Sequence, residues 1–328
     1  MDKKVILVTG ANGFLGRAIV SLLRASGLIV CATDINPRCF MPGIMYKQAD
    51  ITRPDEVSGT VGNTNVIIHV AGLAHVFSPD EKASERMRLV NEMGTANMAA
   101  AAAQKGVGHF VLISSVSVYG RSSQSTSGNN PALNPSGPYA ISKYHAELRA
   151  REAAQKAGMP LTVLRLATLY GEGDPGNVAR LMRALDKRKF FWVGDGHNRK
   201  SLLYKGDAAR ACLAVALRPP NDVTAYNVSA PPCTMRAIVQ GLATALEKGP
   251  IPLRIPPSFA LASCNILSGL SKRPFSNWHL TIEKWLADEV YDTTPIERDY
   301  GFRTQIDLVE GLRREVLFYR QNAGNVRP

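Results

Sequence analysis

The chain has 328 residues, 45% of them hydrophobic, and a net charge of +12 at pH 7. This length exceeds the usual size of one compact core, so we expect a large domain with a smaller lobe. No module typical of nucleic-acid binding accompanies the basic charge, no signal peptide fits before the first apolar run at Val5, and no apolar run reaches the roughly 20 residues of a membrane helix. We therefore expect a cytoplasmic protein that binds neither nucleic acid nor membrane.

Alternating strand and helix patterns fill the first two-thirds of the chain, which is typical of an α/β protein. The cysteines show no CxxC pair and no spacing typical of metal ligands, so we expect reduced, structural cysteines and no metal site. They are Cys31, Cys39, Cys212, Cys233 and Cys264.

The chain opens with the pattern of a dinucleotide-binding βα turn. Apolar residues 5–8 lead into residues 9–16, TGANGFLG, and then into a helical pattern. Gly10 permits the tight turn, Gly13 lets the backbone approach a pyrophosphate, and Gly16 lets the helix lie close to the sheet. The positive helix N-terminus favours the phosphates. The cofactor contacts predicted from this turn are Gly10, Asn12, Gly13, Phe14, Leu15 and Gly16.

The second predicted strand, residues 28–33, ends in Asp34. A carboxylate at this position accepts hydrogen bonds from the adenosine ribose hydroxyls and repels a 2′-phosphate, which favours NAD over NADP. Arg38, four residues further along, would tolerate the 2′-phosphate, so NADP remains an alternative cofactor. Asp50, with Ile51 beside it, ends the third predicted strand and is either an adenine contact or a helix cap.

The fourth predicted strand, residues 66–70, is followed by Ala71 and Gly72. Small residues here let the backbone pass beside a cofactor, so we predict contacts from Val70, Ala71 and Gly72. His69 is interpreted as a packed strand residue rather than a catalyst.

Two further segments carry the predicted chemistry. Buried-strand residues 108–113 end in Ser114 and Ser115, and an open α/β sheet binds its ligand at the carboxyl ends of such strands. A helix is predicted from Pro138 to Gly158, with Ser136 or Gly137 as its cap. This helix places Tyr139 and Lys143 on one face, at positions i and i+4.

The pairing of tyrosine with lysine has a specific use. A tyrosine with its ordinary pKa of about 10 is a poor base at neutral pH unless a cation and a helix N-terminus favour its phenolate. Lys143 supplies that cation and can also hold the nicotinamide ribose, while Ser115 can bond the substrate oxygen. Hydride then moves between the adjacent carbon and the nicotinamide while Tyr139 handles the proton. We predict Ser115, Tyr139 and Lys143 as catalytic residues, and Tyr139 and Lys143 also as cofactor contacts.

Together these segments resemble the extended short-chain dehydrogenases/reductases of the nucleotide-sugar epimerase and dehydratase group. The matching parts, nearly half the chain, are TGANGFLG (9–16), Asp34, Asp50, HVAG (69–72), Asn91 at the opening of a helix, SSVSVYG (114–120) and YAISK (139–143). The resemblance implies that Ser115, Tyr139 and Lys143 are catalytic and that Ser117 lies close to the sugar.

The resemblance extends into the second half of the chain. Residues 161–171 resemble the family's sixth strand and the loop to the substrate lobe, but Thr168 stands where many sugar epimerases have asparagine. Asn177 matches a position that contacts the nucleotide sugar, and is otherwise a helix cap. Residues 193–204 resemble the family's GDG segment, in which a basic residue meets the diphosphate. Here that residue is Lys200, with Arg199 beside it, and a solvated surface role is the alternative.

The expected fold is α/β, a doubly wound parallel Rossmann sheet with a smaller C-terminal substrate-binding lobe. We expect residues 1–170, with return segments at about 201–228, to bind NAD. Residues 171–200 and 229–328 should bind the nucleotide sugar. Helices are predicted at 235–246 and 307–319.

Three functions of different classes fit these observations. The first is an NAD-dependent epimerase acting at C4 of a UDP-hexose or UDP-N-acetylhexosamine through a 4-keto intermediate. The second is an NAD(P)H-dependent reductase of UDP-4-keto-6-deoxy-hexosamines. The basic GDG segment and the C-terminal region resemble those of this group of reductases. The third, a noncatalytic NAD sensor, is disfavoured by the intact Tyr139 and Lys143. We expect the first, with a UDP-linked sugar as partner and a homodimer left open.

Overall fold

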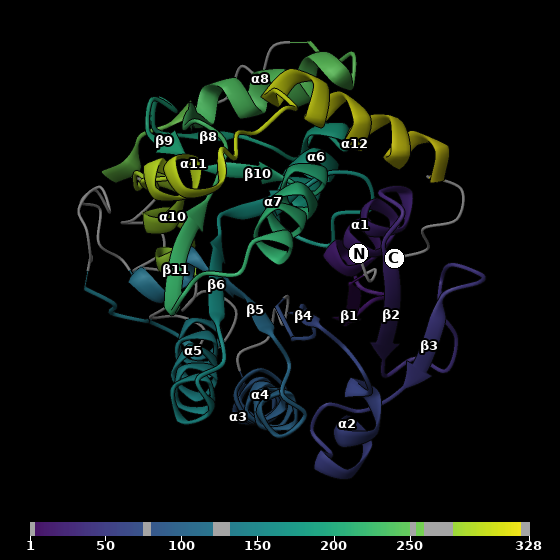
Figure 1. Cartoon of the computed structure of the whole chain (residues 1–328). Helices are drawn as coiled ribbons and strands as arrows, with labels where there is room; N and C mark the ends of the chain where they lie inside the picture. The colour runs from purple at the N-terminus through teal and green to yellow at the C-terminus, as the bar shows by residue number, and fades with distance from the viewer. Residues whose placement is uncertain (1–3, 75–79, 121–131, 250–253, 259–277, 323–328) are drawn as a thin grey trace.

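The computed structural model describes residues 4–74, 80–120, 132–249, 254–258 and 278–322. Within them, seven parallel strands form one sheet in the order β11-β6-β5-β4-β1-β2-β3 (Figure 1). Their bounds are β1 (Val5–Thr9), β2 (Ile29–Asp34), β3 (Met45–Gln48), β4 (Val66–His69), β5 (His109–Ser115), β6 (Leu161–Leu166) and β11 (Val223–Val228). The order reverses beside β1, which is the position where a doubly wound sheet binds its ligand. The fold class expected from the sequence is confirmed.

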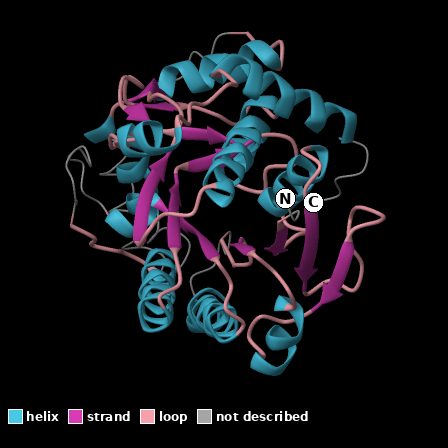
Figure 2. Ribbon diagram, viewed as in Figure 1, coloured by secondary structure: helices cyan, strands magenta, loops and turns pink. Residues whose placement is uncertain are grey.

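Helices cover both faces of the sheet, which explains why its central strands are buried and rich in apolar residues (Figure 2). Ile6 and Val8 of β1 face a core that includes residues of α1 and α7, whereas Leu7 faces a second core with residues of α2, α4 and α5. The bounds are α1 (Phe14–Ala25), α7 (Lys205–Leu217), α2 (Pro54–Val61), α4 (Gly94–Gln104) and α5 (Pro138–Ala157). A further helical stretch, α3 (Glu81–Met87) and the π-helical turn η1 (Arg88–Met93), leads directly into α4.

Most of the remaining elements surround a separate hydrophobic core that includes Tyr170, Trp192 and Leu312. Its helices are α6 (Asn177–Asp186), α8 (Met235–Ala245) and α12 (Leu308–Asn322), and α10 (Trp278–Leu286) and α11 (Thr294–Tyr300) lie nearby in the chain. Ile296 of α11 belongs instead to the core that contains residues of α1 and α7. Short strands pair in twos, namely β7 (Thr168–Tyr170) with β10 (Leu202–Tyr204), β8 (Trp192–Val193) with β13 (Arg254–Ile255), and β9 (Arg199–Lys200) with β12 (Cys233–Thr234). How the residues divide between two lobes stays a prediction.

Local signals located several elements well. The helix predicted from Pro138 is α5, and it ends at Gly158, which adopts the left-handed conformation. Gly137 is its N-cap, without a side-chain hydrogen bond. The prediction that Asn91 opens a helix is wrong, because Asn91 lies inside η1, within a helical stretch that already began at Glu81.

The described helices include none that is long and apolar enough to cross a membrane. Four of the cysteines, Cys31, Cys39, Cys212 and Cys233, are free thiols. Cys264 lies outside the described residues.

Glu315 of α12 is a buried carboxyl group in the separate core. Its Oε2 accepts a hydrogen bond from the Gly171 amide at 3.2 Å, and its Oε1 has no hydrogen-bond partner in the part of the chain that the structure describes. Burial, reinforced by the nearby carboxylates of Asp174 and Glu172, raises the pKa of Glu315 to about 8. The native fold therefore favours the protonated form of this side chain.

Glu315→Gln is expected to remove a loss of stability that develops between about pH 5 and about pH 8. The pKa of this glutamate rises from 4.5 to about 8 on folding, so the native state binds more protons between these values and stability falls as the pH rises through them. Calorimetric Tm values should therefore fall more steeply in the wild type than in Glu315→Gln from about pH 6 to about pH 8.

The matched control is Glu310→Gln, on the same helix, where two arginines lower the pKa of Glu310 to about 2. This variant should keep the wild-type slope above about pH 6 because its carboxylate does not titrate there. Parallel Tm curves for the wild type and Glu315→Gln would contradict the assignment.

Candidate active site

The glycine turn after β1 allows three close approaches. Gly10 has φ +63°, and a Cβ there would lie 2.7 Å from the Cα of Ala71. A Cβ on Gly16 would overlap the carbonyl oxygen of Gly10, and one on Gly13 would lie 3.1 Å from the same oxygen. No side chain among the described residues caps the N-terminus of α1, so the first backbone N–H groups of this helix are available to bind an anion. The turn therefore fits a pyrophosphate.

Asp34 at the end of β2 faces this turn. Its Oδ2 accepts from the amide of Asn12 at 3.0 Å, and its Oδ1 accepts from the amide of Asn36 at 3.1 Å and from Asn36 Nδ2 at 2.7 Å. The Asn12 side chain donates to the Arg38 carbonyl at 2.9 Å and accepts from the Phe40 amide at 2.8 Å. Asn12 therefore fastens the turn to the loop after β2, and Asp34 stands where an adenosine ribose contact is expected.

Asp50 makes a local turn and does not cap a helix. Its Oδ1 accepts from the Thr52 amide at 2.9 Å and from Thr52 Oγ1 at 2.8 Å, whereas the N-cap of α2 is Arg53. Ile51 is buried against Gly94, where a Cβ would lie 2.6 Å from Ile51 Cδ1. The adenine contact proposed for Asp50 and Ile51 stays a prediction.

A buried polar chain fixes the end of β4. Thr9 Oγ1 bonds with His69 Nδ1 at 2.8 Å and accepts from the amides of Val70 and Ala71 at 3.1 Å each. His69 Nε2 bonds with Thr95 Oγ1 at 3.2 Å. Burial lowers the pKa of His69 to about 3, so the ring is neutral at physiological pH. Its interpretation as a packed strand residue is confirmed.

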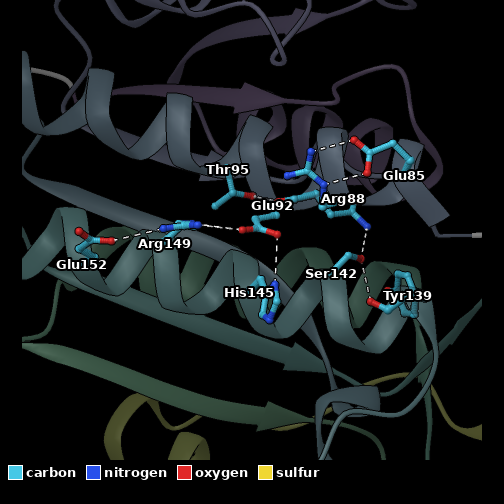
Figure 3. A network of polar contacts seen from close by, with 10 residues as sticks. Glu85, Arg88, Glu92, Thr95, Tyr139, Ser142, His145, Arg149 and Glu152 are labelled. Carbon is cyan, nitrogen blue, oxygen red and sulfur yellow. Dashed lines mark hydrogen bonds and ion pairs between the residues drawn. The ribbon is translucent and has the colours of Figure 1, made fainter.

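The turn η1 clamps the predicted catalytic helix α5 (Figure 3). Asn91 Nδ2 donates to Ser142 Oγ and to the Leu73 carbonyl at 2.9 Å each, its Oδ1 accepts from the Leu73 amide at 2.7 Å, and Ser142 Oγ donates to the Tyr139 carbonyl at 2.9 Å. Beside it, Glu92 pairs with His145 and Arg149 at 3.1 Å each. A π-helical turn is common at functional sites, and no local pattern in the sequence indicates this one.

The three predicted catalytic side chains lie together at the carboxyl end of β5. Tyr139 shares a side-chain hydrogen bond with Ser115, and the Ser117 amide donates to Ser115 Oγ at 3.1 Å. Lys143 is buried, with its Nζ donating to the Ile113 carbonyl of β5. Sequence spacing predicted this meeting of α5 with the strand end.

Burial shifts both titratable groups of this cluster. It raises the pKa of Tyr139, against which the hydrogen bond with Ser115 acts. It lowers the pKa of Lys143 to about 8, so the ammonium still predominates at neutral pH. The phenol of Tyr139 is therefore uncharged at neutral pH and must ionise before it can take a proton, a step that the Lys143 cation one turn along the same helix favours.

Among the predicted substrate residues, Ser117 lies two residues after Ser115, and Thr168 lies two residues after Leu166, which pairs with Ser115 in the sheet. Ser117 follows Ser115 in the 3₁₀ turn η2 (Val116–Tyr119), and its buried Oγ has no hydrogen-bond partner in the ranges that the structure describes. Thr168 is half-buried at the start of β7. Both are expected to meet the sugar.

Asn177 is exposed as the first residue of α6 and does not cap it. The N-cap is Gly176, and Asp174 stabilises this helix end by accepting from the Gly176 amide at 2.6 Å and from the Ala179 amide at 3.0 Å. The capping alternative for Asn177 is therefore wrong, and its predicted contact with the nucleotide sugar stays a prediction.

The two basic residues of the GDG segment differ in exposure. Lys200 is 4% exposed, and its Nζ donates to the Lys284 carbonyl at 2.6 Å and pairs with Glu289 Oε2 at 3.3 Å. Arg199 is exposed, with its Nε 4.0 Å from Asp288 Oδ2. To bind a diphosphate, Lys200 would have to give up its buried ion pair with Glu289. Arg199 would have to give up only its long, solvent-exposed pair with Asp288, which contributes little.

The family model described as the NAD-dependent epimerase/dehydratase family matches residues 6–229. The chain belongs to this family. Membership confirms the resemblance, the identification as an enzyme and the expectation of NAD as cofactor.

Curated relatives with different reactions resemble this family member. The chain is 29% identical to the 2-alkyl-3-oxoalkanoate reductase of Stenotrophomonas maltophilia over 94% of its length and 97% of the reductase. It is 33% identical to the UDP-glucose 4-epimerase of Vibrio cholerae over 56% of its length and 57% of the epimerase. The solved UDP-glucose 4-epimerase of Thermotoga maritima, with UDP-glucose, is 22% identical with a TM-score of 0.78, covering 97% of this chain and 99% of the epimerase.

Asp34→Asn is expected to weaken NAD binding by about tenfold, because a charged ribose acceptor is replaced by a neutral amide. The preference for NAD over NADP should narrow, since the repulsive charge is also removed. Calorimetric titration with both dinucleotides measures this. Asp80→Asn, at the exposed N-cap of α3, is the control and should bind both as the wild type does. An unchanged NAD affinity in Asp34→Asn would exclude Asp34 as the ribose ligand.

Proposed function

We propose that the enzyme is a 4-epimerase that oxidises C4 of a UDP-hexose or UDP-N-acetylhexosamine to a ketone and reduces it from the other face. The observation that carries the proposal is the junction of Tyr139, Ser115 and a buried Lys143 at the carboxyl end of β5. The substrate class is supported by the UDP-glucose 4-epimerase relative and by the solved epimerase that contains UDP-glucose.

Each residue of the junction has one task in this proposal. Tyr139 Oη takes the proton of the C4 hydroxyl, and Ser115 Oγ donates a hydrogen bond to the same oxygen. The Lys143 ammonium, one turn along the same helix, is assigned to favour the tyrosine phenolate by its charge. The hydrogen bond with Ser115 already acts against the effect of burial on the Tyr139 pKa. Tyr139 returns the proton when the ketone is reduced. Bound NAD supplies the hydride chemistry, with the Gly10–Gly16 turn and Asp34 as its holders.

The substrate side of the proposal uses residues beyond β5. The hydroxyl of Ser117, which has no partner among the described residues, and the half-buried Thr168 are assigned to the sugar, and the exposed amide of Asn177 to the nucleotide. Arg199 and Lys200 are assigned to the diphosphate, in exchange for their present carboxylate partners. Residues 171–200 and 229–328 would thus bind the nucleotide sugar, with Val70, Ala71 and Gly72 beside the cofactor.

The second candidate is an NAD(P)H-dependent reductase of a UDP-4-keto-6-deoxy-hexosamine. It is favoured by the relative that matches the chain over 94% of its length, because that relative is a ketone reductase. The same Tyr139 would then give its proton to the substrate oxygen once per turnover, with net oxidation of the reduced cofactor.

Product analysis separates the two candidates. The enzyme is incubated with NAD and UDP-glucose or UDP-N-acetylglucosamine, and separately with NADH or NADPH and a UDP-4-keto-6-deoxy-hexosamine. NMR resolves the products while absorbance follows the reduced cofactor. We expect a C4 epimer from at least one hexose without net change in reduced cofactor. Stoichiometric oxidation of NADH or NADPH by the keto sugar, with no epimer from either hexose, would overturn the epimerase in favour of the reductase.

A further inference from the structure

A buried ion pair lies directly behind Lys143. Glu147 is one helical turn further along α5, and its side chain is 1% exposed. Its Oε1 accepts from Ser114 Oγ at 2.6 Å and from Arg165 Nε at 3.0 Å, and its Oε2 accepts from Arg165 Nη2 at 2.7 Å. Two parallel hydrogen bonds between a guanidinium and a carboxylate fix both side chains in one geometry.

The pair continues into the rest of the protein through Arg165. Arg165 Nη1 donates to Tyr119 Oη at 3.0 Å, Tyr119 Oη donates to Asn227 Oδ1 at 2.7 Å, and Asn227 Nδ2 donates to the Asp292 carbonyl at 3.2 Å. Tyr119 belongs to η2, the turn that begins directly after Ser115. The network therefore joins the helix of Tyr139 to the segment of Ser115.

Glu147 also acts on the charge state of Lys143. Burial lowers the pKa of Lys143, and the negative charge of Glu147 acts in the opposite direction. The titratable or charged groups around the lysine and the pair are Tyr139, Glu147 and Arg151 on α5, His69 on β4, Arg165 on β6 and Tyr119 on η2. His69 is neutral at physiological pH, so it adds no charge.

We propose that Glu147 and Arg165 are positioning residues that keep the Lys143 ammonium charged and aligned with Tyr139 and hold the Ser115 segment in place through Tyr119. The inference rests on the proposed function, because it takes Tyr139 and Lys143 as the proton-transfer pair. Neither Glu147 nor Arg165 touches the reacting atoms.

Removing the two charges should have opposite effects. Glu147→Gln leaves the Arg165 cation uncompensated near Lys143, so the lysine loses its proton at lower pH. Arg165→Met leaves the Glu147 carboxylate uncompensated, so the lysine keeps its proton to higher pH. A role limited to packing predicts no such opposition, because both changes would loosen the same contact.

The experiment measures the pH dependence of kcat/KM and, in the cofactor-free protein, the titration of Lys143 Nζ by ¹⁵N NMR, with Lys143→Met assigning the signal. The basic limb of the kcat/KM profile and the midpoint of the Lys143 titration should both move to lower pH by about one unit in Glu147→Gln. Both should move to higher pH by about one unit in Arg165→Met. Glu92→Gln is the matched control, since Glu92 of η1 is a buried carboxylate that pairs with Arg149 of α5, the helix that carries Lys143. It should move neither.

Unmoved titrations, or shifts in the same direction, would overturn the inference. If either variant fails to fold, Ser114→Ala replaces it, because it removes one hydrogen bond from Glu147 without changing a charge. That variant should move the Lys143 titration upward, and an unmoved titration would again contradict the inference. Lys143→Met with full turnover would instead overturn the proposed function, whereas an inactive Lys143→Met with unmoved titrations would overturn the positioning role alone.

Discussion

The burial of Lys143 beside β5 is the constraint on which the site depends. An ammonium removed from water is costly unless hydrogen bonds and an opposite charge compensate it, and here the Ile113 carbonyl and Glu147 do so. Glu147 in turn requires Arg165, because an unpaired buried carboxylate is equally costly. These linked requirements fix α5 against β5 and β6. Tyr139, one turn before Lys143 on the same helix, is thereby held at the strand end.

The dinucleotide turn and the catalytic helix meet at Gly72. A Cβ on this residue would lie 2.9 Å from Asn91 Oδ1, which is too close, and 3.9 Å from Lys143 Nζ, which is ordinary contact, so a side chain here would displace the Asn91 amide of the π-helical clamp. The same stretch begins with the backbone that Thr9 holds against Gly10. One short segment after β4 thus borders the predicted cofactor turn on one side and the proposed proton-transfer pair, Tyr139 and Lys143, on the other.

Much of this architecture was readable from the sequence, because its signals are local. Each signal acts within a few residues of the chain. These signals are the apolar runs of the parallel strands, the glycine turn, and the proline and glycine at the two ends of α5. Ion-pair partners that lie far apart in the chain cannot be predicted from such local signals. Arg165 is a charged residue in an apolar strand, yet nothing local names Glu147 as its partner. Lys200 was predicted to face a diphosphate, but in this structure it pairs with Glu289, far along the chain.

Replacing Tyr139 tests the central claim, that its hydroxyl transfers the proton at the buried junction. In Tyr139→Phe we expect kcat to fall by about 10²–10⁴-fold, because only the proton-transferring oxygen is lost. NAD affinity, measured by calorimetry, should remain within about twofold of the wild type, since the turn and Asp34 are untouched. Tyr144→Phe, on the same helix, controls for loss of a partly buried hydroxyl. Turnover near the wild-type value in Tyr139→Phe would contradict the account.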